Sequence, residues 1–155
     1  MNLLSSKRFK RAKDKDIIFE ILDVKKNKTS GLFKNLQEIF TFVVALGIKF
    51  RKTEPIVGGS SEPIAIDLFT EDQQKYFDAV ILFHDAGNIK KLDKDDPENV
   101  AIYLKTIEEY ANAGLSILKN KLLVHPEDSF NIISRLIQEE LKKDIPTEAT
   151  GDFEW

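Results

Sequence analysis

Two clusters of basic side chains are the residues in this sequence best suited to binding chemistry. The first is the segment Lys49-Phe50-Arg51-Lys52, in which cations flank an aromatic ring. The second lies near the N-terminus and consists of Lys7, Arg8, Lys10 and Arg11. Lys and Arg contact nucleic-acid phosphates whatever the base sequence, and an aromatic ring can stack on a base, although Phe50 follows a helix and such residues more often pack in the core. We therefore predict that these cations contact DNA or an acidic partner protein.

The distribution of charge along the chain favours the same interpretation. Residues 1–52 contain 13 Lys and Arg against 5 Asp and Glu, a formal charge of +8. Residues 53–155 contain 10 against 21, a formal charge of −11, so the net charge of −3 conceals an uneven division. Such asymmetry is typical of proteins that bind nucleic acid or an oppositely charged partner. It also occurs where both charged faces only meet solvent.

Catalytic and metal-binding chemistry is poorly represented in the sequence. The chain has no cysteine, which excludes disulfides, thiolate catalysis and cysteine-ligated metal centres. Its two histidines, His84 and His125, lack a second histidine or a glutamate at metalloprotease spacing. The pair His84 and Asp85 leaves open a small hydrolase as a third hypothesis. We predict no catalytic residue, no cofactor and no metal site, and hence no enzymatic activity.

Two polar segments have a simpler explanation than ligand binding. The acidic residues around Asp96 supply oxygen atoms of the kind that hard cations prefer, but the glycine and terminal glutamate of a calcium loop are missing. Capping of the following helix by Asp96, together with solvation, explains them. The segment Gly58-Gly59-Ser60-Ser61 is not followed by the Gly-Lys-Ser/Thr sequence of a phosphate-binding loop. It is therefore predicted to be a flexible loop.

Apolar residues recurring at helical spacing predict about five helices to carry these side chains. The predicted helices begin near Asp16, Asn35, Asp72, Pro97 and Pro126. Gly47 is predicted to end the second helix, and Ala113-Gly114 to bend or interrupt the fourth. Pro55 and Pro63 disfavour helix at the residues before them, so the segment between them is extended. The expected fold is a mainly α, single compact domain with one short extended Pro/Gly segment.

The chain is predicted to divide into three parts. Residues 1–15 form a basic flexible arm, which could equally be a disordered leader; residues 16–145 form the helical domain; and residues 146–155 form an acidic flexible tail. No apolar run approaches the roughly 18–20 residues that span a bilayer. The basic residues follow a very short apolar patch, unlike a signal peptide. We therefore expect a cytoplasmic protein with no membrane contact.

Two segments resemble a known protein family. Residues 40–52 place Ala-Leu-Gly at a helix end before a basic stretch, with Ser61-Glu62-Pro63-Ile64 downstream, and residues 108–118 contain Glu-Tyr-Ala-Asn-Ala-Gly-Leu. These segments are similar, in the same order, to parts of the small proteins associated with bacterial DNA phosphorothioation (Dnd) systems, the family of Dnd system-associated protein 4. The chain departs from that pattern at Val43-Val44, where alanines are common, and at Ala113, which replaces a glycine.

The resemblance implies a role in bacterial antiviral defence, linked to restriction that depends on DNA modification. We expect a non-enzymatic accessory subunit that contacts DNA or a larger nuclease, helicase or ATPase through its basic surface. The alternative is a protein-interaction subunit that never touches nucleic acid and docks through the broadly apolar helix over residues 36–46. The sequence leaves homo-oligomer formation open.

Overall fold

The computed structural model describes residues 2–144, and most of these residues lie in helices. The elements are β1 (Arg8–Ala12), α1 (Asp16–Leu22), α2 (Leu36–Phe50), β2 (Ser60–Ala65), α3 (Glu71–His84), α4 (Pro97–Leu122) and α5 (Ser129–Asp144), joined in part by short 3-10 turns. The predicted mainly helical fold is confirmed. The predicted acidic tail, residues 146–155, lies outside the described residues. Within residues 2–144, no helix combines the length and apolar character needed to cross a membrane.

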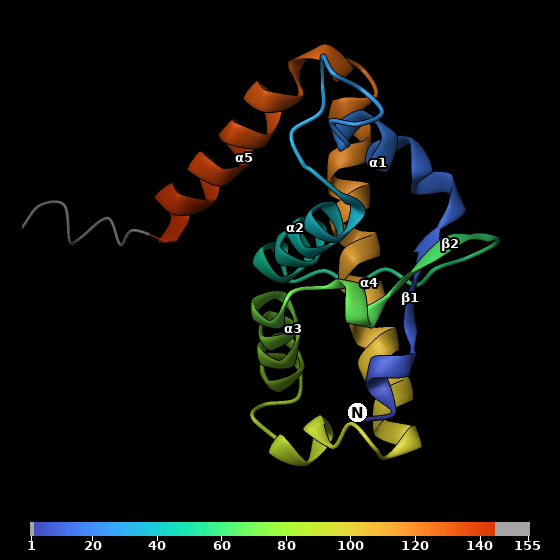
Figure 1. The fold of residues 1–155 in the computed structure, drawn as a ribbon. Coiled ribbons are helices and arrows are strands. Elements are labelled where there is room, and N and C mark those ends of the chain that lie inside the picture. The colour runs from blue at the N-terminus through green and yellow to red at the C-terminus, as the bar shows by residue number, and fades with distance from the viewer. Residues whose placement is uncertain (1, 145–155) are drawn as a thin grey trace, which may run out of the picture.

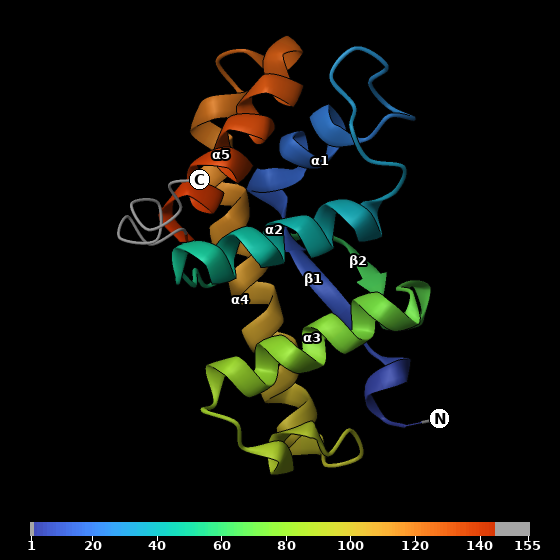
Figure 2. The same ribbon diagram turned by 90° about the vertical axis from the view of Figure 1, so that its left-hand side faces the viewer.

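Helix α4, 26 residues long, runs through the whole molecule, and the other elements pack against it (Figure 1). Helices α2 and α3 form one layer, and α4 with the β1–β2 pair forms the other (Figure 2). Helix α5 reverses direction after α4 and then diverges from it (Figure 1). The described residues thus build one compact two-layer domain around a central helix.

Two glycines let α2 and α4 cross at very short range. A Cβ atom at Gly114 would lie 1.9 Å from the carbonyl oxygen of Val43, and one at Gly47 would lie 2.2 Å from that of Tyr110. Real side chains do not tolerate such distances, so both positions require glycine although glycine costs about 1 kcal/mol relative to alanine inside a helix. Gly47 therefore does not end α2 and Ala113-Gly114 does not interrupt α4, because both glycines lie within continuous helices.

Four phenylalanines from different elements form the centre of the core. Phe9 comes from β1, Phe40 from α2, Phe69 from the turn before α3, and Phe77 from α3. The ring centroids of every pair among them lie 5.0–6.1 Å apart, mostly edge to face. Such pairs add to the hydrophobic stabilisation that burial of the rings supplies. This cluster joins the two layers.

The N-terminal residues belong to this core. Strand β1 pairs antiparallel with β2, and Phe9, opposite Ile64, is fully buried. The structure therefore replaces the predicted flexible arm over residues 1–15 with an ordered strand at Arg8–Ala12. The reason is strand alternation: Phe9 points into the core while Arg8 and Lys10 point to solvent, so a run of cations conceals one anchoring residue.

An irregularity in the strand pairing fastens the sheet to α4. The register shifts between Phe9 and Arg11, opposite a stretch of β2 that contains Pro63, a residue without a backbone N–H. The backbone N–H of Lys10 donates instead to the carboxylate of Glu108 on α4. The Glu108 side chain of the central helix thus accepts a hydrogen bond from a β1 amide that β2 leaves unpaired at the irregularity.

Helix starts agree with the sequence where capping is local. The Asn35 side chain accepts a hydrogen bond from the N–H of Glu38, and Asp96 accepts from the first-turn N–H groups of α4. Pro97 occupies the first turn of α4, as predicted. Thr70 and Gln73 form a reciprocal capping box that starts α3. These caps explain why the helix starts were predictable from short segments.

The glycine crossing makes a direct prediction for stability. Gly114→Ala forces a methyl group onto the Val43 carbonyl, so the helices must separate, and we expect the free energy of unfolding to fall by about 3 kcal/mol or more. Gly59→Ala is the control, because its Cβ would meet the Lys13 side chain at an ordinary 3.5 Å. Urea unfolding followed by circular dichroism measures both. Equal stability of the two variants would contradict the crossing described here.

Candidate contact surface at the end of helix α2

Helix α2 ends in a geometry that places Arg51 in an unusual conformation. Arg51 has φ 53° and ψ 47°, the left-handed region that favours glycine. Its N–H donates to the carbonyl of Ile48 at 3.1 Å, and the N–H of Lys52 donates to that of Gly47 at 2.9 Å, the paired bonds of a Schellman motif. A non-glycine residue in this region costs roughly 1–2 kcal/mol. Because such strain gathers at functional positions, Arg51 is a candidate functional residue.

Glu54, three residues further along, is held by side chains from two other segments. Its carboxylate accepts hydrogen bonds from Lys15 at 2.9 Å and from the Ser116 hydroxyl at 2.8 and 2.9 Å. The Asn112 amide donates to the carbonyls of Glu54 and Pro55 and accepts from Lys15 at 2.8 Å. The backbone N–H of Glu54 also donates to a carbonyl of α4 at 3.0 Å. This network fastens residues 54–55 to α4.

The charge of Glu54 is compensated inside the network. Burial by itself raises the pKa of Glu54, but the hydrogen bonds from Lys15 and Ser116, with the positive charges of Lys15 and Lys119, lower the pKa overall. The carboxylate is therefore ionised at neutral pH. The Lys15 side chain is 5% exposed and forms an ion pair with it. The pair leaves little net charge from Glu54 to oppose an approaching anion.

The same segment forms the wall of a cavity of about 550 Å³. The cavity is lined by Arg51, Lys52, Thr53, Glu54, Ala113, Ser116 and Ile117. Arg51, Lys52 and Thr53 are exposed, so two cations and a hydroxyl meet solvent beside a carboxylate that is already paired. This arrangement suits an anion such as a phosphate group, because Lys and Arg supply charge and hydrogen-bond donors.

The other predicted contact residues lie in different surroundings. Lys49 is exposed on the last turn of α2, and its positive charge acts on the Tyr76 hydroxyl of α3, whose pKa is raised by burial. Lys7, Arg8 and Lys10 are exposed on or before β1. The structure therefore brings Arg51 and Lys52 together on one cavity and leaves these other cations apart from it.

Arg11 is engaged within the fold. It is 9% exposed, its guanidinium lies 4.7 Å from the centre of the Phe19 ring, and it pairs with Asp16 at 3.3 Å. It also donates to the carbonyl of Glu62 at 3.0 Å. Burial lowers the pKa of Arg11, and the negative charges of Asp16 and Glu62 oppose that shift. These contacts use Arg11 to join β1, β2 and α1, which removes it from the exposed cations.

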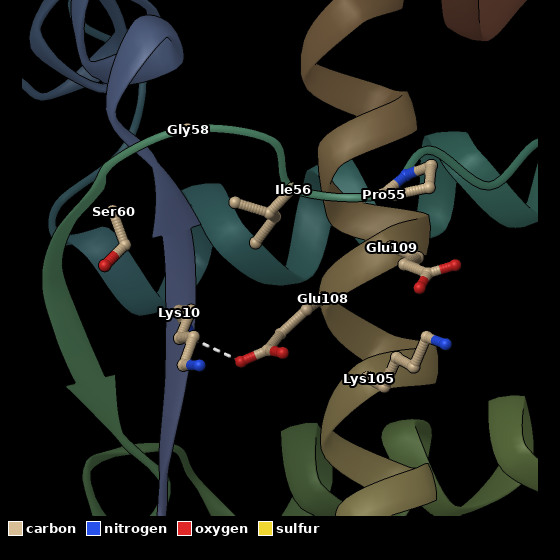
Figure 3. Close-up of a pocket in the computed structure, with 8 residues that line it drawn as sticks. All are labelled: Lys10, Pro55, Ile56, Gly58, Ser60, Lys105, Glu108 and Glu109. Carbon is tan, nitrogen blue, oxygen red and sulfur yellow. Dashed lines mark hydrogen bonds between the residues drawn. The ribbon is translucent and has the colours of Figure 1, made fainter.

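A second cavity, of about 290 Å³, lies between β1, α4 and the segment that leads to β2 (Figure 3). It is lined by Lys10, Pro55, Ile56, Gly58, Ser60, Lys105, Glu108 and Glu109. Burial raises the pKa of Glu108, while the backbone N–H and the charge of Lys10 oppose that shift. Its mixed charge fits a polyanion less well than the cavity beside Arg51. Ser60 and Ser61 already belong to β2, so the predicted flexible loop is shorter than expected.

The histidines occupy separate places. The His84 Nδ1 atom lies 2.8 Å from the Tyr110 hydroxyl, and one carboxylate oxygen of Asp85 is buried with no hydrogen-bond partner among the described residues. His84 and Asp85 line a small cavity of about 130 Å³. His125 lies 3.4 Å from Glu127 on the surface. Across the described part of the chain, no three His, Cys, Asp or Glu residues gather as a metal site would require.

Sequence reasoning missed the residues that hold the contact surface. Lys15, Glu54, Asn112 and Ser116 are far apart in sequence, and each has an ordinary surface explanation taken alone. The available signal was the segment over residues 108–118, which contains Asn112 and Ser116 and carries one half of the family resemblance. The other half contains Gly47, and the two segments meet where α2 crosses α4.

The fold and the site define a small helical protein whose basic segment is held in place beside a cavity. Its sequence matches the family described as DNA sulphur modification system-associated protein 4 over residues 8–154. The chain therefore belongs to this family, which confirms the resemblance carried by its two segments. No curated protein and no solved structure matches the chain.

The left-handed conformation of Arg51 predicts an unusual order of stabilities. Arg51→Gly and Arg51→Ala both remove the side chain, but only glycine relieves the backbone strain, so we expect the glycine variant to be more stable by about 1 kcal/mol. Inside an ordinary helix the order is the reverse. Urea unfolding of the two variants measures the difference. A more stable alanine variant would contradict the assigned geometry.

Proposed function

We propose that this protein is a non-enzymatic accessory subunit of a bacterial antiviral defence system linked to DNA sulphur modification, and that it contacts DNA through Arg51 and Lys52. Membership of the family supports the association with DNA sulphur modification. The observation that carries the contact is the strained Arg51, presented beside Lys52 on a cavity whose one carboxylate is paired internally.

Electrostatics favours the phosphate backbone as the contacted group. Exposed cations that neutralise phosphates release condensed counterions, so their binding is independent of base sequence and weakens steeply with salt. Phosphate contacts position a protein on nucleic acid without reading its bases. An accessory subunit that positions a larger nuclease, helicase or ATPase requires no base recognition of its own.

The non-enzymatic part of the proposal is supported by how the polar residues are used. Lys15, Glu54, Asn112 and Ser116 are satisfied by one another, and their bonds hold a segment in place. His84 bonds to Tyr110. The exception is Asp85, whose carboxylate has a buried oxygen with no partner among the described residues, and the pair of His84 and Asp85 is the basis of the hydrolase alternative. Full activity of a His84→Ala variant in a hydrolysis assay would dismiss a hydrolase that uses His84 with Asp85.

DNA binding by charge-matched variants tests the contact. Replacing Arg51 and Lys52 by alanine should weaken duplex DNA binding at least about tenfold at low salt and reduce the slope of log K against log salt by about 1.8, or 0.9 for each phosphate contact. The control replaces Lys25 and Lys26, two exposed cations in the loop after α1, and removes the same charge. Fluorescence anisotropy across a salt series measures both.

Two results would contradict the DNA contact. The first is that the wild-type protein does not bind duplex or single-stranded DNA at low salt. The second is that the Arg51/Lys52 variant and the Lys25/Lys26 variant lose the same amount of affinity. Equal loss would mean that net charge alone, and not the surface at the end of α2, attracts the DNA.

A second candidate function is docking onto a larger protein, and α5 favours it. The apolar α2 that suggested docking is largely buried, with Ile39, Val43 and Val44 fully so. On α5, Phe130 and Ile137 are 66% and 47% exposed and lie seven positions apart on one face. These two exposed apolar side chains are a candidate point of contact for a protein partner.

Co-purification tests this second candidate. If α5 docks, the full chain should co-purify with a nuclease, helicase or ATPase of the DNA sulphur modification system, and Phe130→Ser should reduce the recovery several-fold. Phe83→Ser is the matched control, because Phe83 is 58% exposed on α3. Recovery that is unaffected by Phe130→Ser, or lowered equally by both variants, argues against α5.

A further inference from the structure

We infer that Glu54 is a positioning residue for the contact surface: an acidic side chain that increases affinity for a polyanion, because it holds Arg51 and Lys52 in their binding geometry. The inference rests on the proposed contact with DNA and adds to it. A purely electrostatic account makes the opposite prediction, since a carboxylate beside a phosphate-binding cation repels the ligand.

Glu54 is held at its backbone and at its side chain. Its N–H donates to the carbonyl of Glu109 at 3.0 Å, and its own carbonyl accepts from Asn112 at 3.3 Å. Its carboxylate accepts from Lys15 and Ser116. Partners on α4 and before α1 therefore fix one residue in space, which makes Glu54 an anchor for the chain on either side.

The second anchor lies two residues earlier. The N–H of Lys52 donates to the carbonyl of Gly47, at the position where α2 crosses α4. Thr53 is the single residue between Lys52 and Glu54, so the chain from Lys52 to Glu54 is held at both ends, and Arg51 directly precedes the first fixed point. Loss of the carboxylate bonds weakens the later of the two, which then keeps only its backbone bonds to Glu109 and Asn112. A segment ordered before binding avoids the entropy that ordering would otherwise cost.

The buried Lys15 explains why an acid is required at this position. A lysine that is 4% exposed needs an opposite charge, and Glu54 supplies it while Asn112 accepts a further hydrogen bond. A neutral residue in place of Glu54 would leave the ammonium of Lys15 without its counter-charge. The carboxylate is thereby tied to the interior, and its charge is compensated before any ligand arrives.

Three single substitutions in the full chain separate positioning from charge. Glu54→Gln removes the negative charge, Ser116→Ala removes one hydrogen bond to the carboxylate with every charge kept, and Glu109→Gln removes a neighbouring negative charge outside the network. If Glu54 acts by positioning, Glu54→Gln should weaken DNA binding about fivefold. This factor corresponds to a variant in which the segment with Arg51 and Lys52 adopts its binding geometry about a fifth of the time. Ser116→Ala should weaken binding less, with an unchanged salt dependence, and Glu109→Gln should not weaken it.

The readouts are DNA affinity across a salt series, circular dichroism to verify folding, and amide hydrogen exchange of residues 51–54 in the free protein. Faster exchange with weaker binding in Glu54→Gln or Ser116→Ala supports the inference. A folded Glu54→Gln variant that binds DNA as tightly as wild type, or more tightly, overturns it. If Glu54→Gln does not fold, the DNA affinity and amide exchange of Ser116→Ala decide whether the inference holds. If wild type binds no DNA, the proposed function fails, and amide exchange at residues 51–54 still decides whether Glu54 orders the segment.

Discussion

The close crossing of α2 over α4 is the constraint on which the rest of the structure depends. Gly47 and Gly114 bring each helix backbone against the other, so no side chain separates the two elements. The crossing determines where α2 ends relative to α4. Because that end lies beside Asn112 and Ser116, the segment after it can be bonded to α4 through Glu54. A displacement of α2 by the width of a methyl group would break this alignment.

The positive charge of the N-terminal third serves two purposes. Part of it is structural: Arg11 lies over Phe19 and pairs with Asp16, and buried Lys15 pairs with Glu54. The rest is exposed, including Arg51 and Lys52 at the end of α2. The charge asymmetry in the sequence therefore overstates the surface available to a polyanion. Position and pairing determine which cations can act on a ligand.

Local features were predictable from the sequence, and long-range ones were not. The caps at Asn35 and Asp96 depend on residues within one helical turn, so short segments revealed them. Strand β1 was missed because its large core residue, Phe9, is surrounded by cations, and its strand partner lies some fifty residues away. Gly47 looked like a helix end because a sequence does not show what a glycine packs against. The Glu54 network was hidden for the same reason.

Hydrogen exchange of the full chain with and without duplex DNA at low salt most directly tests the claim that the end of α2 is a pre-ordered contact surface. The amides of residues 51–54 should already exchange slowly in the free protein and should slow further on DNA, while exchange in α5 is unchanged. Slowing confined to α5, or rapid amide exchange of residues 51–54 in the free protein, would contradict the claim.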